Sequence, residues 1–455
     1  MKPTTTARAT IDREKLQNLL QEEIRLYAER HPRSKQLFEK AREHLVGGLP
    51  MPWMARWGAF PLFVSEARNA RFTDVDGHEY VDFCLGDTGA MTGHSPPQLV
   101  KTVDEQIKKG ITYMLPTENA IWVAEEFSRR FGLAHWQFTL SATDANRFAI
   151  RIARHVTQRP YVLVFNWCYH GTVDESFATT EGDKVVARFG NLGPPVDPSQ
   201  TTRVIEFNDV QALTNALKDQ KVACVLAEPA MTNIGIVHPQ PGFHDALRRA
   251  TRDTGTLLIL DETHTISASP GGCTQLYGLQ PDMVTIGKPI GSGIPAAAYG
   301  MSKDVAGRLS EALSGDHCDT CGIGGTLAAN ALSMAAMRAT LENILTPDAY
   351  KGMVAMADNF KAGVFDAIAE LGLPWTVAQL GCRVEYWFMQ DEPKNGSEAA
   401  SHIDADLDRY MHIASLNRGV LMTPFHNMAL LCPSTTQADV DRHTQVFHEI
   451  AGRLI

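Results

Sequence analysis

Two residues with reactive side chains each stand at the end of an apolar run. Lys288 ends MVTIGK and is followed by a Gly-containing turn, and Asp261 comes near the end of TLLILDE. A lysine beside such a turn can lose solvation, keep a neutral amine and act as a nucleophile. A carboxylate that ends a buried strand stays ionised only where it meets a positive charge. Taken singly, a surface lysine and a helix-capping or salt-bridged aspartate explain these residues as well.

Two further segments suit the recognition of a phosphate group and of a planar ring. Ser141–Asn146 (SATDAN) precede a helical pattern, so that backbone N–H groups there are free to bind an anion. Asn166–Gly171 (NWCYHG) follow the apolar run YVLVF, and Tyr169 in that segment can lie flat on a cofactor ring. An ordinary Ser/Thr cap and core packing of the tyrosine remain the alternatives.

A sheet is needed to position these four segments. Between about residues 95 and 330, short apolar runs alternate with helical stretches, which is typical of an α/β fold with a mainly parallel sheet flanked by helices. Ligands of such sheets bind beyond the carboxyl ends of the strands, so the four polar segments are predicted to converge there. The expected strands cover residues 161–165, 222–229, 256–262 and 283–287.

The flanking parts of the chain predict a second, smaller α/β domain. Residues 11–46 favour polar helices, and the turn at Asp76-Gly77 favours a hairpin between 72–75 and 80–83. A helix near 327–345 precedes expected strands at 382–389 and 428–432. We therefore expect an N-terminal arm and hairpin that belong to the small domain (1–80), a large domain (81–335) and a C-terminal small domain (336–455).

Composition and charge exclude several classes of partner. The 455 residues are 44% hydrophobic and 21% charged, as in ordinary globular proteins. The formal charge of −10 and the absence of a Lys/Arg-rich run predict no nucleic-acid or membrane partner. The first residues lack the apolar stretch of a secretory signal, so a cytoplasmic location is expected. Cys318 and Cys321 form a CxxC pair that no second ligand pair completes, and we predict no metal site.

The order and spacing of many motifs are shared with one enzyme family. The chain resembles the class III aminotransferases, which are fold-type I pyridoxal 5′-phosphate (PLP) enzymes, and in particular the branch that contains glutamate-1-semialdehyde aminomutase. The resemblance runs from about Val46 to near His443, and it implies an α/β large domain that binds PLP. The motifs that carry it are VGG (46–48), PLF (61–63), DVDGHEYVDF (74–83), GHSPP (93–97), SATDAN (141–146), YHG (169–171), AEPAMTN (227–233), LILDE (258–262), IGKPIGSGIPAAAYG (286–300) and GGT (324–326).

The resemblance also implies roles for residues around the cofactor ring. Lys288 is expected to form a Schiff base with PLP, and Asp261 to pair with the pyridine nitrogen. Tyr169 is expected to stack on the ring. Asn233 falls where relatives contact the ring hydroxyl, and Glu228 where an acid orients the site.

Other positions correspond to the phosphate site, with some departures from the family pattern. Ala142 and Thr143 are expected to hold the phosphate, and Thr326 resembles a residue that is lent by a second subunit, which implies a homodimer with shared active sites. Ala142 stands where relatives usually have glycine, and Asp144 where they have a longer acid. Thr263-His264 replaces a more apolar pair, so the opposite face of the ring is expected to be more polar.

The expected activity is that of an aminotransferase, which moves an amino group from an amine or amino acid donor to a keto acid or aldehyde. Trp53, Arg56, Trp57 and His426 are candidate substrate residues. Arg56 and Arg383 are candidate partners for a substrate carboxylate, because arginine binds carboxylates through two hydrogen bonds.

Several alternatives stay open. Within the family, the chain is alternatively a glutamate-1-semialdehyde-type 2,1-aminomutase or a racemase. Outside it, the alternative is a cofactor-free α/β protein that binds nucleotides through the turn at residues 287–293, although that turn matches neither common phosphate-loop pattern.

Overall fold

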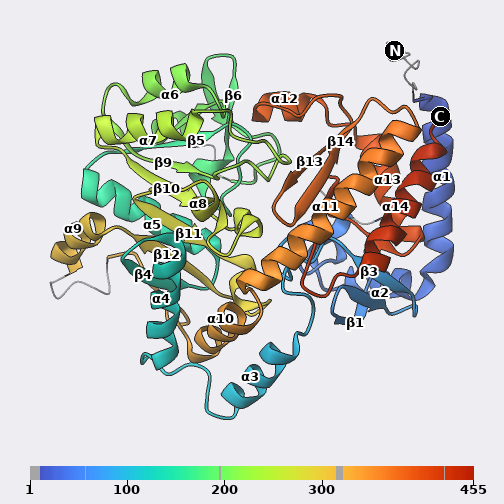
Figure 1. Ribbon diagram of the computed structural model, residues 1–455, viewed down its shortest axis with the longest axis horizontal. Helices are drawn as coiled ribbons and strands as arrows, with labels where there is room; N and C mark the ends of the chain where they lie inside the picture. Colours follow the sequence, from blue (N-terminus) through green and yellow to red (C-terminus); the bar gives the residue numbers. More distant parts are fainter. Residues whose placement is uncertain (1–10, 57, 194–195, 314–320, 425) are drawn as a thin grey trace. The chain divides into compact units, whose positions relative to one another are not determined.

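The computed structural model describes residues 11–56, 58–193, 196–313, 321–424 and 426–455 (Figure 1). They form two compact units. Unit 1 contains the described residues up to Pro96 together with Asp348–Glu392 and His402–Ile455, and unit 2 contains Pro97–Pro347 and Pro393–Ser401. The domain boundaries expected after residues 80 and 335 stay a prediction.

A seven-stranded sheet forms the centre of unit 2 (Figure 1). The strands β8, β5, β9, β10 and β11 run parallel, and β12 is antiparallel to its neighbours β11 and β4. The predicted mainly parallel sheet is therefore confirmed. In spatial order the strands are β4 (His135–Thr139), β12 (Ala297–Met301), β11 (Met283–Ile286), β10 (Leu257–Asp261), β9 (Val222–Ala227), β5 (Tyr161–Phe165) and β8 (Thr202–Ile205).

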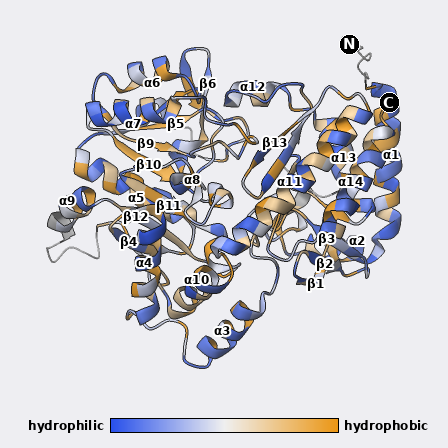
Figure 2. Cartoon of the chain, viewed as in Figure 1, coloured by the Kyte–Doolittle hydropathy of each residue, from blue (hydrophilic) through white to orange (hydrophobic). Residues whose placement is uncertain are grey.

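Alternation along β10 distributes its side chains between two helical layers. Leu257 and Ile259 belong to a core cluster with α5, whereas Leu258 and Leu260 face a pocket that α7 also lines. Apolar residues concentrate in the strands of this sheet (Figure 2). The helices of unit 2 are α3 (Pro97–Ile107), α4 (Glu118–Phe131), α5 (Ala142–Thr157), α6 (Val210–Leu217), α7 (Phe243–Thr254), α8 (Gly272–Leu276), α9 (Lys303–Leu313), α10 (Ala331–Asn343) and α12 (Gly396–Ser401).

Shorter elements connect these helices and strands. A two-stranded hairpin is formed by β6 (Ala178–Glu181) and β7 (Lys184–Ala187). Single 3₁₀ turns in unit 2 are η3 (Asp174–Phe177), η4 (Pro198–Gln200), η5 (Thr265–Ala268) and η6 (Lys288–Gly291).

The described residues of unit 1 form two small sheets and five helices. The predicted hairpin is present, with β2 (Arg71–Asp74) antiparallel to β3 (Glu79–Asp82), and β15 (Val420–Leu421) adds to β3 in parallel. The N-terminal and C-terminal parts of the chain thus share one sheet, which β1 (Val64–Arg68) completes. The other sheet contains β13 (Thr376–Leu380), β14 (Arg383–Trp387) and β16 (Met428–Leu430). The helical elements are α1 (Arg13–Arg30), α2 (Pro32–Ala41), η1 (Val46–Gly48), η2 (Pro52–Arg56), α11 (Pro347–Glu370), α13 (Ala405–Asn417) and α14 (Gln437–Gly452).

None of the helices in the described part of the chain combines the length and apolarity needed to cross a membrane. The cytoplasmic location expected from the sequence stays a prediction.

Candidate active site

Asp261, the last residue of β10, is buried at the carboxyl end of the sheet. Its Oδ2 accepts hydrogen bonds from Asn146 Nδ2 (2.8 Å) and His170 Nδ1 (3.0 Å), and its Oδ1 accepts one from Thr263 N (3.0 Å). Burial by itself would raise the pKa of this carboxyl, but the bond and charge of His170, together with the bonds from Thr263 and Asn146, hold the pKa of Asp261 well below its ordinary value. The site therefore contains a buried carboxylate that stays negative.

His170 supplies the positive charge that keeps this carboxylate ionised. Burial would lower the pKa of the imidazole, yet Cys168 and Asp261 raise the pKa of His170 above its ordinary value. While Nδ1 bonds Asp261, Nε2 is buried and has no hydrogen-bond partner within the described structure. Asn146 bonds the same oxygen of Asp261 as His170 does, and Asn146 is itself held, because its Oδ1 accepts from Thr285 Oγ1 (2.6 Å) on the neighbouring strand.

Lys288 follows β11, the strand next to β10, and begins η6. Its φ of 51° lies in the left-handed region, which a residue with a Cβ adopts only where its surroundings hold it. The turn that carries Lys288 is held by α10, since Ser292 Oγ and Thr340 Oγ1 are 2.7 Å apart. Lys288 Nζ lies 2.7 Å from His264 Nε2. The polar pair Thr263-His264 therefore brings an imidazole within hydrogen-bond distance of the lysine amine.

The N-terminus of α5 lies directly against the residue that precedes Lys288. A Cβ built on Gly287 would be 3.0 Å from Ala142 Cβ and 3.2 Å from Ala142 N, so glycine permits this approach. Ser141 caps the helix by accepting from Asp144 N, while the first-turn N–H groups of Ala142 and Thr143 have no intrahelical acceptor. The predicted phosphate segment and the predicted nucleophile therefore lie together.

The loop after β5 contacts the same helix terminus. Thr172 N donates to Thr143 Oγ1 (3.0 Å), and Gly171, with φ of 77°, lies so close that a Cβ there would be 2.2 Å from that oxygen. Tyr169 in this loop is half-buried, and its ring meets Phe177 edge to face at 6.0 Å. Asn233 Nδ2 lies 3.5 Å from Trp167 O of the loop.

Glu228 follows β9 and is buried. Its Oε2 accepts from Thr232 N (3.1 Å) and from the Thr232 hydroxyl, whereas Oε1 has no hydrogen-bond partner among the described atoms. Burial raises the pKa of this carboxyl, which the nearby charge of His170 opposes. Glu228 and His170 thus each direct one unsatisfied polar atom into the interior at the carboxyl ends of adjacent strands.

The remaining predicted residues belong to other segments of the chain. Thr326 belongs to unit 2 and is exposed. Trp53 and His426 belong to unit 1, where Trp53 is exposed and His426 Nδ1 lies 2.9 Å from Glu385 Oε1. Arg56 ends η2 in the same unit, and Trp57 lies outside the described residues, as does Cys318.

Arg383, a candidate partner for a substrate carboxylate, is fully buried within unit 1. Its guanidinium donates to Thr88 Oγ1 (2.5 Å) and contacts the Met428 sulfur. These contacts give Arg383 a place in the core of its unit.

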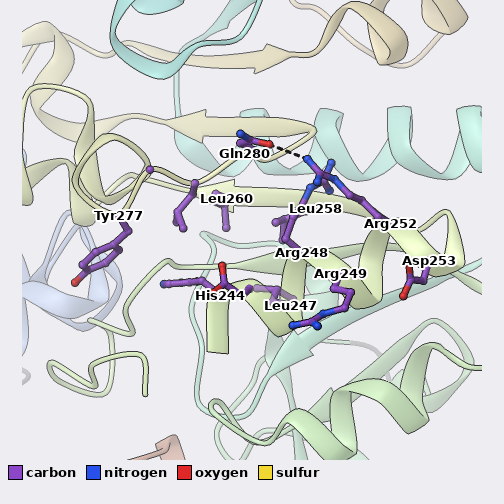
Figure 3. Close-up of a pocket in the computed structure, with 13 residues that line it drawn as sticks. His244, Leu247, Arg248, Arg249, Arg252, Asp253, Leu258, Leu260, Tyr277 and Gln280 are labelled. Atoms are coloured by element: carbon purple, nitrogen blue, oxygen red, sulfur yellow. Dashed lines mark hydrogen bonds between the residues drawn. The ribbon is translucent and has the colours of Figure 1, made fainter. Parts of the chain in front are cut away.

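A pocket of about 420 Å³ lies on the α7 side of the sheet. Figure 3 shows Arg248, Arg249 and Arg252 of α7 around it, and Gln280 bonded to Arg252. Leu258 and Leu260 line this pocket, whereas Asp261 bonds Asn146 of α5. The pocket is therefore separate from the predicted site.

The residues present fit PLP. The buried negative carboxylate of Asp261 suits a protonated ring nitrogen, the free N–H groups of α5 suit a phosphate, and an amine lies at the adjacent strand end. Sequence reasoning did not identify His170 and Asn146 as the partners of Asp261. A signal existed for Asn146, because it lies four residues after Ala142 and so shares its helix face.

Comparisons with known proteins agree with this arrangement. A family model for class-III aminotransferases matches residues 53–450. The glutamate-1-semialdehyde 2,1-aminomutase of Methanosphaera stadtmanae is 31% identical over 421 residues, which cover 90% of this chain and 96% of that protein. A crystal structure of a glutamate-1-semialdehyde-aminomutase from Pseudomonas aeruginosa PAO1, a lysine-to-alanine variant in complex with PMP, is 46% identical with a TM-score of 0.96, covering 98% of this chain and 100% of that one.

A solved structure with lower sequence identity is named for a different activity. The omega-transaminase from Sphaerobacter thermophilus is 28% identical, with a TM-score of 0.84, and the match covers 93% of this chain and 98% of that one. The predicted resemblance, the predicted fold-type I architecture and the predicted cofactor are confirmed by these matches.

Proposed function

Because the chain belongs to the class III aminotransferase family, we propose that it moves an amino group between adjacent carbons of one bound substrate, as a glutamate-1-semialdehyde 2,1-aminomutase. The sequence favoured transfer between two molecules and kept the aminomutase as an alternative. The supporting observation is that relatives named for the aminomutase match nearly the whole chain, at 31% and 46% identity.

Pyridoxal 5′-phosphate is the cofactor, and when bound it takes up the electron pair that a substrate carbon retains on losing a proton. In the proposed mechanism, Asp261 holds a proton on the ring nitrogen by its charge. His170 and Asn146 keep that carboxylate ionised and fixed, so its charge need not reorganise during the reaction.

Lys288 would hold the cofactor through its amine in this proposal, and the same amine would carry a proton to and from the substrate carbon. His264 Nε2, 2.7 Å from Nζ, can accept or return that proton and limits the directions in which the amine turns. Ala142 and Thr143 bind the phosphate through the terminus of α5, and Tyr169 covers one face of the ring. Asn233 and Glu228 orient the ring hydroxyl side.

Transfer between two molecules is the second candidate, and the match to an omega-transaminase favours it. The two functions use the same residues of unit 2, and they differ in whether the substrate stays bound through both halves of the reaction.

Glutamate 1-semialdehyde supplied as the sole substrate distinguishes these functions. We expect the purified holoenzyme to convert it to the isomer with the amine on C1 and the carbonyl on C2, at a rate that added pyruvate does not change. Release of a dicarbonyl product together with alanine, only when pyruvate is present, would establish the transaminase instead. The Lys288→Ala protein is the blank for both assays.

A homodimer with shared sites is proposed as the catalytic unit, and an exposed apolar surface on unit 2 supports it. Residues of α3, of the following loop and of α4 expose large side chains, with Met114 and Leu115 each 72% exposed. A patch of this kind on a protein surface usually marks an interface. Thr326 is itself exposed, as expected for a residue lent to a neighbouring subunit. The residues of the patch are Val100, Ile107, Ile111, Tyr113, Met114, Leu115 and Ile121.

We predict that Met114→Glu shifts the protein from dimer to monomer, because the substitution would bury a charge at the interface. Sedimentation velocity measures the mass directly. Val210→Glu is the matched control, since Val210 is exposed on α6, outside the patch. A Met114→Glu protein that stays dimeric, or a wild-type monomer, would contradict the assignment of this surface.

A further inference from the structure

A nine-residue segment of the C-terminal part of the chain packs on the loop that carries Tyr169. Residues 393–401 cluster with unit 2, although the chain on both sides of them belongs to unit 1. This segment, which we name the strap, ends in the short helix α12. Lys394 O in the strap accepts a hydrogen bond from Asn208 Nδ2 (2.7 Å) in the segment after β8.

The strap holds the first residue of the loop through Ser397. Ser397 Oγ donates to Glu206 Oε1 (2.5 Å) and accepts from Asn166 Nδ2 (3.0 Å), which itself donates to Glu206 Oε1 (2.7 Å). Thr179 Oγ1 of β6 donates to Asn166 Oδ1 (2.7 Å), so both ends of the buried amide are bound. An amide with its donors and its acceptor engaged in this way has one orientation.

Gly396 brings the strap into direct contact with the loop backbone. A Cβ on Gly396 would lie 2.3 Å from Asn166 O and 3.0 Å from Trp167 Cβ. Because the closer of these atoms belongs to the backbone, any larger residue must displace either the strap or the loop. Trp167 has a φ of 67°, a left-handed conformation that a residue with a Cβ keeps only under the constraint of its surroundings.

Arg188 holds the same loop from another side. Its guanidinium donates to Cys168 O (2.5 Å) and lies 5.7 Å from the centre of the Trp167 ring. The strained residue is thus fixed between the strap and Arg188. Tyr169, the proposed ring-stacking residue, and His170, the partner of Asp261, follow Trp167 by two and three residues.

We propose that the strap positions the Asn166–Gly171 loop, with Gly396 and Ser397 as its positioning residues, so that Tyr169 is presented to the cofactor ring. This inference rests on the proposed role of Tyr169. Loosening the strap would free the loop, and with it His170, the partner of Asp261, while leaving the sheet and Lys288 in place.

Hydrogen exchange of the protein without cofactor tests the strap independently of catalysis. We expect Ser397→Ala and Gly396→Ala to raise amide exchange in peptides covering 166–172 on the order of tenfold, with β10 peptides unchanged, since exchange reports local opening. Ser310→Ala and Gly307→Ala are matched controls in α9, where Ser310 Oγ donates to Ala306 O of its own helix and a Cβ on Gly307 would meet no atom within 4 Å. Unchanged exchange in the loop, or a uniform rise throughout unit 2, would overturn the proposal.

Cofactor binding gives the second measurement. The strap variants are expected to weaken PLP affinity and to reduce the circular dichroism of the bound cofactor. Tyr169→Ala, which removes the stacking ring, is expected to be non-additive with Ser397→Ala, as coupled residues are. Additive effects would overturn the strap as a positioning device for Tyr169. If the wild-type protein bound no PLP, the proposed function would fail. The exchange experiment needs no cofactor, so it would still test whether the strap holds the loop.

Discussion

Replacing Lys288 with alanine is expected to lower amino-group transfer roughly 10⁴-fold or more, because both the nucleophile and the proton carrier are lost. Alanine and lysine both carry a Cβ, so the φ of 51° at this position strains alanine no more than lysine, and the turn and the strand before it should keep their conformation. The Lys288→Ala protein is therefore expected to fold and to bind PLP without a covalent link. Steady-state assays and gel filtration with added cofactor measure both properties.

Lys303→Ala is the matched control, because Lys303 is an exposed lysine at the start of α9 in the same unit. It should retain wild-type turnover. Residual turnover of Lys288→Ala within tenfold of wild type would show that another group acts as nucleophile.

Replacing Asp261 with asparagine is expected to reduce turnover by roughly 10²–10³-fold, the range seen when preorganised electrostatic stabilisation of a transition state is removed. Asparagine preserves the size of the side chain and one acceptor oxygen, while it removes the charge that His170 balances. The loss should fall on kcat more than on KM, since the charge acts on the electron pair formed in the reaction.

Two neighbouring variants separate this effect from general damage. Glu262→Gln changes the adjacent buried carboxyl, whose oxygens accept from Thr265 Oγ1, Cys273 N and Thr274 N, so it should affect stability more than turnover. His170→Gln should give a smaller loss than Asp261→Asn, because the carboxyl of Asp261 and its bonds to Thr263 and Asn146 remain, and these also lower its pKa. Equal turnover of Asp261→Asn and wild type would remove Asp261 from the mechanism.

Local sequence signals were sufficient for much of the large sheet. The apolar run at 161–165 is β5 (Tyr161–Phe165), and the predictions at 256–262 and 283–287 contain β10 and β11. The strands β12 (AAYGM) and β8 (TRVI) were not predicted. Small side chains in β12 and an arginine in β8 weaken the apolar signal. The order of the strands depends on pairings between distant segments, which composition and periodicity do not encode.

The site was predictable where it lies at strand ends and not where it depends on packing. Lys288, Asp261 and the α5 terminus follow from the rule that ligands bind beyond the carboxyl ends of parallel strands. The contacts of Asp261 with Asn146 and His170 span 115 and 91 residues, so they exist only once α5 and the loop after β5 have packed. The burial of Arg383 also depends on packing, and the sequence did not predict it, because arginine is rarely fully buried.

The central claim is a covalent bond between Lys288 and the cofactor. Borohydride reduction of the purified protein, followed by peptide mass spectrometry, tests it most directly. The account predicts loss of the cofactor's visible absorbance and a pyridoxyl phosphate adduct on the peptide that contains Lys288. An unmodified Lys288, or an adduct on another lysine, would contradict it.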